Sequence, residues 1–269
     1  MNFKKMNVYK WDAKDYQDNS AVQQKWAREL ITKIRLKGNE TVLDIGCGDG
    51  KITAEIAKKL PDGSIIGVDN SREMIDLANK NFPQETYKNV LFKLCDAKKL
   101  NFNNEFDIIF SNAALHWVKN HILVLKRIKK ALKKNGKILL QMGGKGNARE
   151  IIKAVNLIKN KSEWREYFIN FKFPYSFYDP DKYRILLDSI GLEINYIKLI
   201  NKDMTHKGKE ALKGWIRTTW FPYTNRVPEN LRNLFTDEII NNYIEKHPLD
   251  DRSFTHVKMV RLEVMAKKL

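Results

Sequence analysis

Short apolar runs alternate with amphipathic patterns over the first half of the chain. The apolar runs occupy residues 41–45, 65–68, 90–94, 106–110 and 137–142. Apolar runs of this length, bounded by turn residues, are typical of strands buried on both faces of a parallel sheet. Because helical patterns separate the runs, the order predicts an α/β domain with a doubly wound sheet.

Helices are predicted between these strands wherever apolar residues recur at spacings of three and four. The first helix precedes the sheet, with Ser20 as a candidate N-cap and residues 37–39 as its end. Ser71 is a candidate N-cap of a later helix that ends at Pro83. Residues 135–136 end the helix before the fifth strand.

The second half of the chain is less regular. Residues 148–178 combine a helical pattern with an aromatic stretch, and residues 205–248 are predicted to be helical. Between them we predict a helix at 180–191 and an alternating strand at 192–200. A final strand is predicted at 257–264.

The turn after the first strand is rich in glycine. Gly46, Gly48 and Gly50 follow at every second position, and glycine lets a ligand lie directly against the main chain. Dinucleotide pyrophosphates are bound by a different spacing, G-x-G-x-x-G. Asp44 is a poor neighbour for pyrophosphate but suits a cationic group, such as the α-ammonium of a methionine moiety. The alternative is a nucleotide-binding or purely structural turn.

Two further acids lie at the ends of predicted strands. In open parallel sheets, ligands bind outside the carboxyl ends of the strands. Asp69 ends the second strand and is placed to accept both hydroxyls of a ribose. Asp96 follows the third strand and is placed to accept from an adenine amino group. A turn aspartate that caps the next segment is the alternative for Asp96.

The net charge raises the question of a nucleic-acid partner. The chain has 49 Lys and Arg residues against 32 Asp and Glu residues, a formal net charge of +17. Such an excess can neutralise phosphates, but the lysines are spread along the chain. The group at residues 126–134 belongs to a helix with an apolar opposite face, as in a solvated surface. We therefore expect no specific nucleic-acid partner, although the charge can attract an anionic small substrate.

Cysteine content and hydropathy bear on the compartment. Cys47 and Cys95 are the only two cysteines and form no disulfide framework. No run reaches eighteen apolar residues, and the first sixteen residues are too charged for a signal peptide. We expect a soluble cytoplasmic protein without a membrane partner or a metal.

Five motifs together identify a family by resemblance. They are VLDIGCGDG at 42–50, VDNS at 68–71, CDA at 95–97, FDIIFSNAALHWV at 106–118 and LKKNGKILL at 132–140. They resemble the motifs of class I S-adenosylmethionine (SAM) dependent methyltransferases. The resemblance implies a Rossmann-like sheet of seven strands, in which the last strand is antiparallel and lies between the fifth and the sixth. It also implies SAM as cofactor and S-adenosylhomocysteine (SAH) as product.

A narrower resemblance concerns the acceptor. Residues 111–118 and the helix with Tyr16, Ser20, Gln23 and Trp26 are similar to trans-aconitate and juvenile-hormone-acid methyltransferases. Malonyl-carrier-protein carboxyl methyltransferases are similar too. Enzymes of the first two groups methylate carboxylates of small organic acids. No N-P-P-Y or D-P-P-Y follows the fourth strand, which argues against methylation of DNA or of a glutamine amide, and the cysteines are not placed for a cysteine-nucleophile mechanism.

The resemblance implies specific contacts for the cofactor and the acceptor. The implied cofactor contacts are Asp44, Gly46, Cys47, Gly48 and Gly50 at the methionine end, Asp69 at the ribose, Asn70, Asp96 and Ala97 at the adenine, and Asn112 and Ala113 at the sulfonium. Tyr16 and Gln23 would close over cofactor and acceptor, and His116 and Trp117 would lie on the acceptor side. The implied catalytic residues are Gln23, His116 and Trp117.

A single domain spans residues 1–269 in this interpretation. Its SAM-binding core is 21–147, and 148–178 and 205–248 are insertions that form a lid. The last strand is 257–264.

The reaction would be an in-line displacement at the methyl carbon, in which positioning is worth roughly 7–11 kcal/mol. A carboxylate acceptor is already ionised and needs no base. A hydroxyl acceptor would make His116 the first base to test. The alternative for His116 is a histidine that only stacks on Trp117. Candidate cations to orient an acid, each also readable as a surface charge, are Lys145, Arg149, Arg217 and Arg226.

Two other functions stay open at this point. One is an RNA or protein methyltransferase that uses the basic surface, and the other is a non-catalytic SAM-binding protein. The sequence gives no indication of the oligomeric state.

Overall fold

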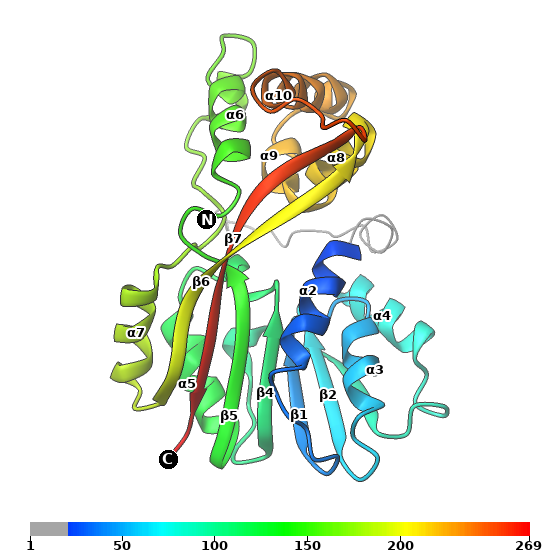
Figure 1. The fold of residues 1–269 in the computed structure, drawn as a ribbon, viewed down its shortest axis with the longest axis vertical. Helices are drawn as coiled ribbons and strands as arrows, with labels where there is room; N and C mark the ends of the chain where they lie inside the picture. The colour runs from blue at the N-terminus through cyan, green and yellow to red at the C-terminus, as the bar shows by residue number, and fades with distance from the viewer. Residues whose placement is uncertain (1–20) are drawn as a thin grey trace, which may run out of the picture.

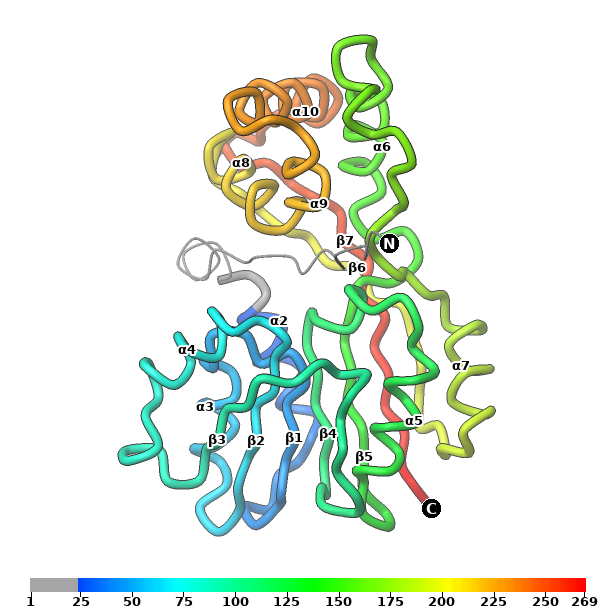
Figure 2. Tube along the Cα trace, turned by 180° about the vertical axis from the view of Figure 1, so that it is seen from behind, coloured from blue at the N-terminus to red at the C-terminus, as the bar shows by residue number. Residues whose placement is uncertain are grey.

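Seven strands form one mixed sheet. The computed structural model of the chain describes residues 21–269, with side chains from residue 24 onward. The strands lie in the order β3-β2-β1-β4-β5-β7-β6 (Figures 1 and 2). Their bounds are β1 Thr41–Ile45, β2 Ser64–Asp69, β3 Val90–Leu94, β4 Phe106–Asn112, β5 Leu132–Gly143, β6 Glu193–Lys207 and β7 Phe254–Lys267. Strands β1 to β5 pair in parallel, and β7 is antiparallel to both β5 and β6. The predicted fold, with the last strand between the fifth and the sixth, is confirmed.

Helices cover both faces of the sheet. One face packs against α2 (Ala21–Ile31), α3 (Lys51–Ala57) and α4 (Arg72–Asn81) through a buried cluster that includes Leu30, Ile56 and Ala78. The other face packs against α5 (His121–Ala131) and α7 (Pro180–Ser189). Burial of β1 on both sides is what its unbroken apolar pattern predicts.

A helical lobe stands above the carboxyl ends of the parallel strands (Figure 1). We define it as α6 (Arg149–Lys159), α8 (Gly208–Thr219), α9 (Phe221–Thr224) and α10 (Arg232–Lys246), with the parts of β6 and β7 that run beyond the sheet. Within residues 21–269 there are also four short 3-10 helices: η1 Ala97–Lys99, η2 Leu115–Trp117, η3 Arg165–Phe168 and η4 Glu229–Leu231.

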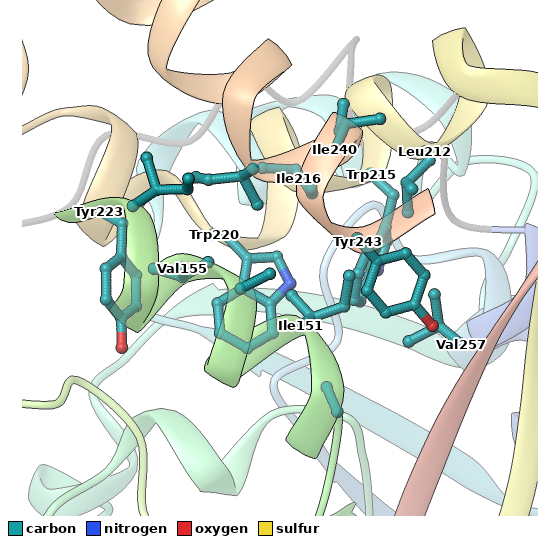
Figure 3. Packing of buried hydrophobic residues seen from close by; sticks show 14 of the residues in the cluster. Ile151, Val155, Leu212, Trp215, Ile216, Trp220, Tyr223, Ile240, Tyr243 and Val257 are labelled. Atoms are coloured by element: carbon teal, nitrogen blue, oxygen red, sulfur yellow. The ribbon is translucent and has the colours of Figure 1, made fainter. Parts of the chain in front are cut away.

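The helical lobe has its own aromatic core. Trp215 and Trp220 are almost fully buried and meet edge to face, with ring centroids 5.8 Å apart. Figure 3 shows them packed with Tyr243 of α10 and Ile151 of α6. The two segments that the sequence predicts as insertions therefore pack against each other. Because this core is continuous with Trp26 of α2, the lobe and the sheet share a buried boundary.

Two strands run further than the sequence predicts. β6 continues to Lys207 and β7 begins at Phe254, so residues 205–207 are strand and not helix. The extended part of β6 and β7 is a two-stranded ribbon that is covered on one face only. In the extended part of β6, Met204 is the single buried apolar side chain and lies among polar residues, so the sequence shows no alternation of apolar and polar positions there.

Smaller boundaries also differ. The helix α5 ends at Ala131, before Asn135, because Leu132 already pairs with Phe106 of β4. The N-cap at Ser71 is confirmed, since its hydroxyl accepts from the amide of Met74 at 3.2 Å. Ser20 lies outside the described residues. Among residues 21–269, no helix is both long and apolar enough to cross a membrane.

Candidate functional site

A first cavity opens at the carboxyl end of β1, beside the glycine turn. We call it the glycine cavity; it measures about 50 Å³. Six of the predicted residues line it, namely Asp44, Gly46, Cys47, Gly48, Asn112 and Ala113. Four lining residues were not predicted, namely Gln24, Asp49, Ile52 and Phe110. The glycine turn and the end of β4 are therefore brought together, as expected where neighbouring parallel strands end.

Asp69 ties the glycine turn to the end of β2. Its Oδ2 accepts from the amide of Gly48 at 3.1 Å, and its Oδ1 accepts from the amide of Ser71 at 2.9 Å. The amide of Gly46 donates to the carbonyl of Val68 at 2.7 Å. A Cβ built on Gly48 would meet no atom within 4 Å, so this stretch of backbone borders open space.

Asp44 is a buried carboxyl group in the floor of the glycine cavity. Its side chain is almost fully buried, and Oδ2 accepts from the Thr53 hydroxyl at 2.7 Å. Burial raises the pKa of Asp44 to about 7, and the charge of Asp69 adds to the rise, while the hydrogen bond from Thr53 opposes it. A buried carboxyl in this state gains from a cationic ligand, because a nearby positive charge stabilises its ionised form.

The cysteine of the glycine turn is not a nucleophile. Burial raises the pKa of the Cys47 thiol, and the charges of Asp69 and Asp44 raise it further. A thiol in such surroundings stays protonated and inert. This agrees with the expectation that the cysteines serve no cysteine-nucleophile mechanism.

The predicted adenine contacts lie outside the glycine cavity. Asp96 caps η1 by accepting from the amide of Lys98 at 2.9 Å, and it forms an ion pair of 3.3 Å with the Lys98 ammonium. The turn-cap interpretation of Asp96 is therefore realised in the structure. Ala97 is half-buried and Asn70 is exposed. Contacts of these residues with adenine stay predictions.

The helix before β1 contributes Gln24, which was not predicted, to the glycine cavity. Tyr16 and the side chain of Gln23 lie outside the described residues. The sequence carried a signal for Gln24, because it lies three positions before Ala27 and seven before Ile31, both buried, and so shares their face of α2.

A second cavity lies between the sheet and the helical lobe. We call it the aromatic cavity; it also measures about 50 Å³. Its lining residues come from four parts of the chain. The sheet side contributes Trp26, Ala113, His116, Trp117 and Asn147, and the lobe contributes Trp215, Thr219 and Trp220. The remaining lining residues are Tyr175 and Phe177 of the segment 175–177, and Met204, Met259 and Arg261 of β6 and β7. Ala113 lines both cavities, so the two meet at the end of β4.

His116 and Trp117 both line the aromatic cavity, and their place on the acceptor side stays a prediction. The ring of His116 lies 5.7 Å from Trp117, and Trp117 stacks on Phe221 of the lobe at 5.2 Å. Burial lowers the pKa of His116 well below its usual value, and the charge of Arg261 lowers it further. His116 is therefore neutral at physiological pH and a weak base.

The cation of this cavity is one that the sequence interpretation missed. Arg261 on β7 is almost fully buried, and its guanidinium lies 5.6 Å from the ring of Trp26. The four predicted cations, Lys145, Arg149, Arg217 and Arg226, are all exposed, and none lines the cavity. Arg261 could have been noticed because it continues the alternation of inward residues Val257 and Met259 along its strand.

Within residues 21–269, no group of three or more His, Cys, Asp or Glu side chains is arranged to hold a metal ion. The arrangement offers an acidic cavity for a cationic ligand and, on the other side of Ala113, an aromatic cavity that contains a buried cation.

Comparison with known proteins decides the family. A family model described as "Methyltransferase domain" matches residues 36–179. The protein 235L of Invertebrate iridescent virus 6, a presumed methyltransferase, is 30% identical over 87% of this chain and 85% of its own length. The chain belongs to the SAM-dependent methyltransferases. It is an enzyme of the class I methyltransferase fold, and its cofactor is SAM.

Distant relatives of this methyltransferase have named acceptors. A trans-aconitate 2-methyltransferase of Variovorax paradoxus is 25% identical, covering 90% of this chain and 92% of its own. A juvenile hormone acid O-methyltransferase of Drosophila melanogaster is 27% identical, covering 87% and 78%. Among solved structures, Haemonchus contortus phosphoethanolamine N-methyltransferase 2, with SAH and phosphomonomethylethanolamine bound, superposes with a TM-score of 0.60 at 20% identity. That superposition covers 95% of this chain and 57% of the other, and at this identity it shows the fold alone.

Proposed function

We propose that this methyltransferase transfers a methyl group from SAM to a carboxylate oxygen of a small-molecule acid by in-line displacement. The observation that carries the proposal is the junction at Ala113 between an acidic cavity and an aromatic cavity containing the buried cation Arg261. The two distant relatives named as trans-aconitate and juvenile hormone acid methyltransferases support the same acceptor class.

The glycine cavity takes the methionine end of SAM in this proposal. The ammonium group lies against Asp44, whose buried carboxyl gains from a cation, and the backbone at Gly48 leaves room for the ligand. Asp69 receives the ribose hydroxyls, because its oxygens already lie between the glycine turn after β1 and the end of β2. The sulfonium then lies near Asn112 and Ala113, at the point where the cavities meet.

The aromatic cavity takes the acceptor. A carboxylate is ionised at neutral pH, so the enzyme has only to hold the oxygen, the methyl carbon and the sulfur in line, which is worth roughly 7–11 kcal/mol. His116 is a poor general base because its pKa is far below neutral. A carboxylate acceptor needs no such base.

Nucleic acid is a less suitable acceptor. The densest lysine group, Lys126, Lys129, Lys130 and Lys268, surrounds a surface hollow between α5 and the end of β7. Lys267 pairs with Lys137 at the start of β5, so this group lies at the amino ends of the parallel strands. The glycine cavity lies at their carboxyl ends, on the opposite edge of the sheet.

An acceptor screen tests the proposed function. Purified full-length protein is incubated with SAM and a panel of small organic acids, matched amines and matched alcohols, and SAH formation is measured. We expect turnover with acids alone. Turnover only with amines or alcohols, under conditions in which SAH binding is demonstrated, would contradict the assignment.

A further inference from the structure

The lobe side of the aromatic cavity contains several buried polar groups. The Trp215 and Trp220 indole nitrogens and the Thr219 hydroxyl are all buried and have no hydrogen-bond partner among the described residues. All three residues line the cavity, and the two tryptophans are 1% and 2% exposed. An indole nitrogen can only donate, and a buried donor without a partner costs on the order of 1–3 kcal/mol.

A fixed positive charge lies in the same cavity. Arg261 is 3% exposed, and its guanidinium stays protonated at every physiological pH. The face of Trp26 stabilises the cation from one side. A planar guanidinium can bind a carboxylate or a phosphate through two parallel hydrogen bonds. Three neutral donors and one cation around one cavity are therefore complementary to an oxyanion.

Building on the proposed carboxyl methylation, we propose that Arg261, Trp215, Trp220 and Thr219 form a subsite for a second, non-reacting anionic group of the acceptor. A carboxylate held by paired hydrogen bonds from a guanidinium has its lone pairs occupied and its charge neutralised. Such a group is a poor nucleophile toward the methyl carbon. The reacting carboxylate lies instead at the Ala113 junction, and the subsite holds the other end of the molecule. The acceptor class is thus a compact acid with two anionic groups, the second being a carboxylate or a phosphate.

The proposed acceptor site takes residues from both the sheet and the helical lobe. Ala113 and the glycine turn belong to the sheet, whereas Trp215, Thr219 and Trp220 belong to the lobe. Arg261 lies on β7, which passes from one to the other (Figure 1). An acceptor bound at both ends would therefore bridge the two halves and close the aromatic cavity around itself.

Tryptophan fluorescence gives a binding readout that does not depend on turnover. Trp26, Trp117, Trp215 and Trp220 all line the cavity. The full-length protein is saturated with SAH and titrated with succinate, glutarate and adipate, each compared with its own monoamide. Inorganic phosphate is the probe for the other oxyanion. We expect at least one diacid to bind tenfold or more tightly than its monoamide.

Variants connect this preference to Arg261. Arg261→Gln should abolish the preference for the diacid while leaving SAH affinity unchanged. Arg261→Lys keeps the charge but not the paired geometry, so it should retain a reduced preference. Arg184→Gln, at an exposed position of α7, is the matched control and should behave as the unaltered protein.

The outcomes separate the proposals. Equal binding of diacids and monoamides, or an unchanged preference in Arg261→Gln, overturns the subsite even if monoacids are methylated. Binding of phosphate more tightly than of any diacid, lost in Arg261→Gln, supports the subsite and assigns it to phosphorylated acids. Failure of SAH to bind the unaltered protein would instead overturn the cofactor geometry of the proposed function.

Discussion

The Thr53 hydroxyl donates a hydrogen bond of 2.7 Å to the carboxyl of Asp44, at the floor of the glycine cavity. Burial of the Asp44 carboxyl raises its pKa to about 7, although the bond from Thr53 opposes the rise, so an acid that titrates near neutral pH lies where the cofactor ammonium is proposed to bind. The ammonium will stabilise the ionised form. Below pH 7, SAH binding should therefore release a proton from Asp44.

The first prediction is that proton release. At pH 6, calorimetric titration with SAH in buffers of different ionisation enthalpy should show close to one proton released per ligand. The Asp44→Asn variant should release markedly less and bind SAH more weakly. An unchanged proton count in Asp44→Asn would show that the ammonium does not lie against this carboxyl.

The same pKa predicts a stability effect of opposite sign. Because the folded state raises the pKa of Asp44 from 3.8 to about 7, the ligand-free protein binds more protons than the unfolded chain between these values. Its stability should fall as pH rises through this window. At pH 8 the ligand-free Asp44→Asn variant should be more stable, by on the order of 4 kcal/mol. Denaturant titration at pH 5 and pH 8 measures the difference, which should be less than half as large at pH 5.

A third prediction concerns Asp69. Asp69→Asn keeps an oxygen to accept from the amide of Ser71 but loses the charge that ribose hydroxyls would meet. A hydrogen bond to a charged group contributes about 1.5–3 kcal/mol, so SAH affinity should fall roughly 100-fold. Some loss of stability is also expected, because the Asn side-chain nitrogen cannot accept from the amide of Gly48. Asp76→Asn, exposed on α4, is the control, and an SAH affinity in Asp69→Asn equal to that of the control would refute the ribose assignment.

Two glycines of the turn should respond differently to alanine. Gly46 has φ of +77°, and a Cβ there would lie 2.1 Å from the Cβ of Ala114. Gly48 has φ of +53°, and its Cβ would meet nothing within 4 Å. A left-handed alanine alone costs roughly 1–2 kcal/mol. Gly46→Ala should therefore lose more stability than Gly48→Ala.

The informative variant of this pair is Gly48→Ala. It should fold with a loss of about 1 kcal/mol, yet its new methyl group enters the space assigned to the cofactor. We expect SAH affinity to fall at least tenfold, measured by calorimetry. Unchanged affinity would place the cofactor away from this stretch of backbone.

A partly buried ion pair fastens the turn after α2 to the sheet. Lys33, just beyond the end of α2, donates to the buried carboxylate of Glu263 on β7 at 2.5 Å, and Tyr196 and Gln141 donate to the same carboxylate at 2.7 and 3.0 Å. Burial alone would raise the pKa of Glu263, but these donors together lower it. The ionised Glu263 carboxylate should therefore stabilise the folded protein at pH values above the pKa of this group in the unfolded chain. This stabilisation should be lost as the pH falls through the pKa of Glu263 in the folded protein.

Glu263→Gln should therefore destabilise the protein at pH 7 by roughly 1.5–3 kcal/mol, because Lys33, Tyr196 and Gln141 lose a charged acceptor. It should also flatten the loss of stability on acidification. Glu193→Gln is the control, since its ion pair with Lys267 is largely exposed and should matter by less than about 1 kcal/mol. Equal unfolding curves for the two variants would contradict the anchoring role.

The last prediction concerns His116. Because its pKa is well below the usual value, the residue does not change protonation between pH 6.5 and 8.5. The rate constant of methyl transfer with both substrates saturating should be flat over this range. His116→Gln should retain that flat profile. A tenfold rise per pH unit that disappears in His116→Gln would identify a general base and a hydroxyl acceptor.

The sheet and the glycine turn were predictable because their signals are local. The apolar runs and the spacing of Asp44, Gly46 and Gly48 lie within single short segments, and each β-α unit repeats the same pattern. The N-cap of α4 at Ser71 was predictable for the same reason. The strands β6 and β7 were predicted at 192–200 and 257–264, but the continuation of β6 to Lys207 was not, because Met204 is its only buried apolar side chain beyond residue 200.

The acceptor side could be predicted only in part. His116 and Trp117 follow β4 directly, so their position at its carboxyl end is a local property. Arg261 reaches the same cavity only because β7 inserts between β5 and β6 and because the lobe covers it. Its sequence neighbours give it the pattern of an inward strand residue but do not reveal its surroundings. Arg217 and Arg226 were chosen from the sequence because they lie in the predicted lid insertion, but both are exposed.

The most direct test of carboxyl methylation is the chemistry of the product. The protein is incubated with methyl-tritiated SAM and the acid that gives the highest turnover, and the purified product is treated with mild alkali. We predict that the label is released as volatile methanol, because methyl esters hydrolyse under these conditions. A label that stays on the product through alkali treatment would show a methyl group on nitrogen, carbon or an ether oxygen, and would contradict the proposed function.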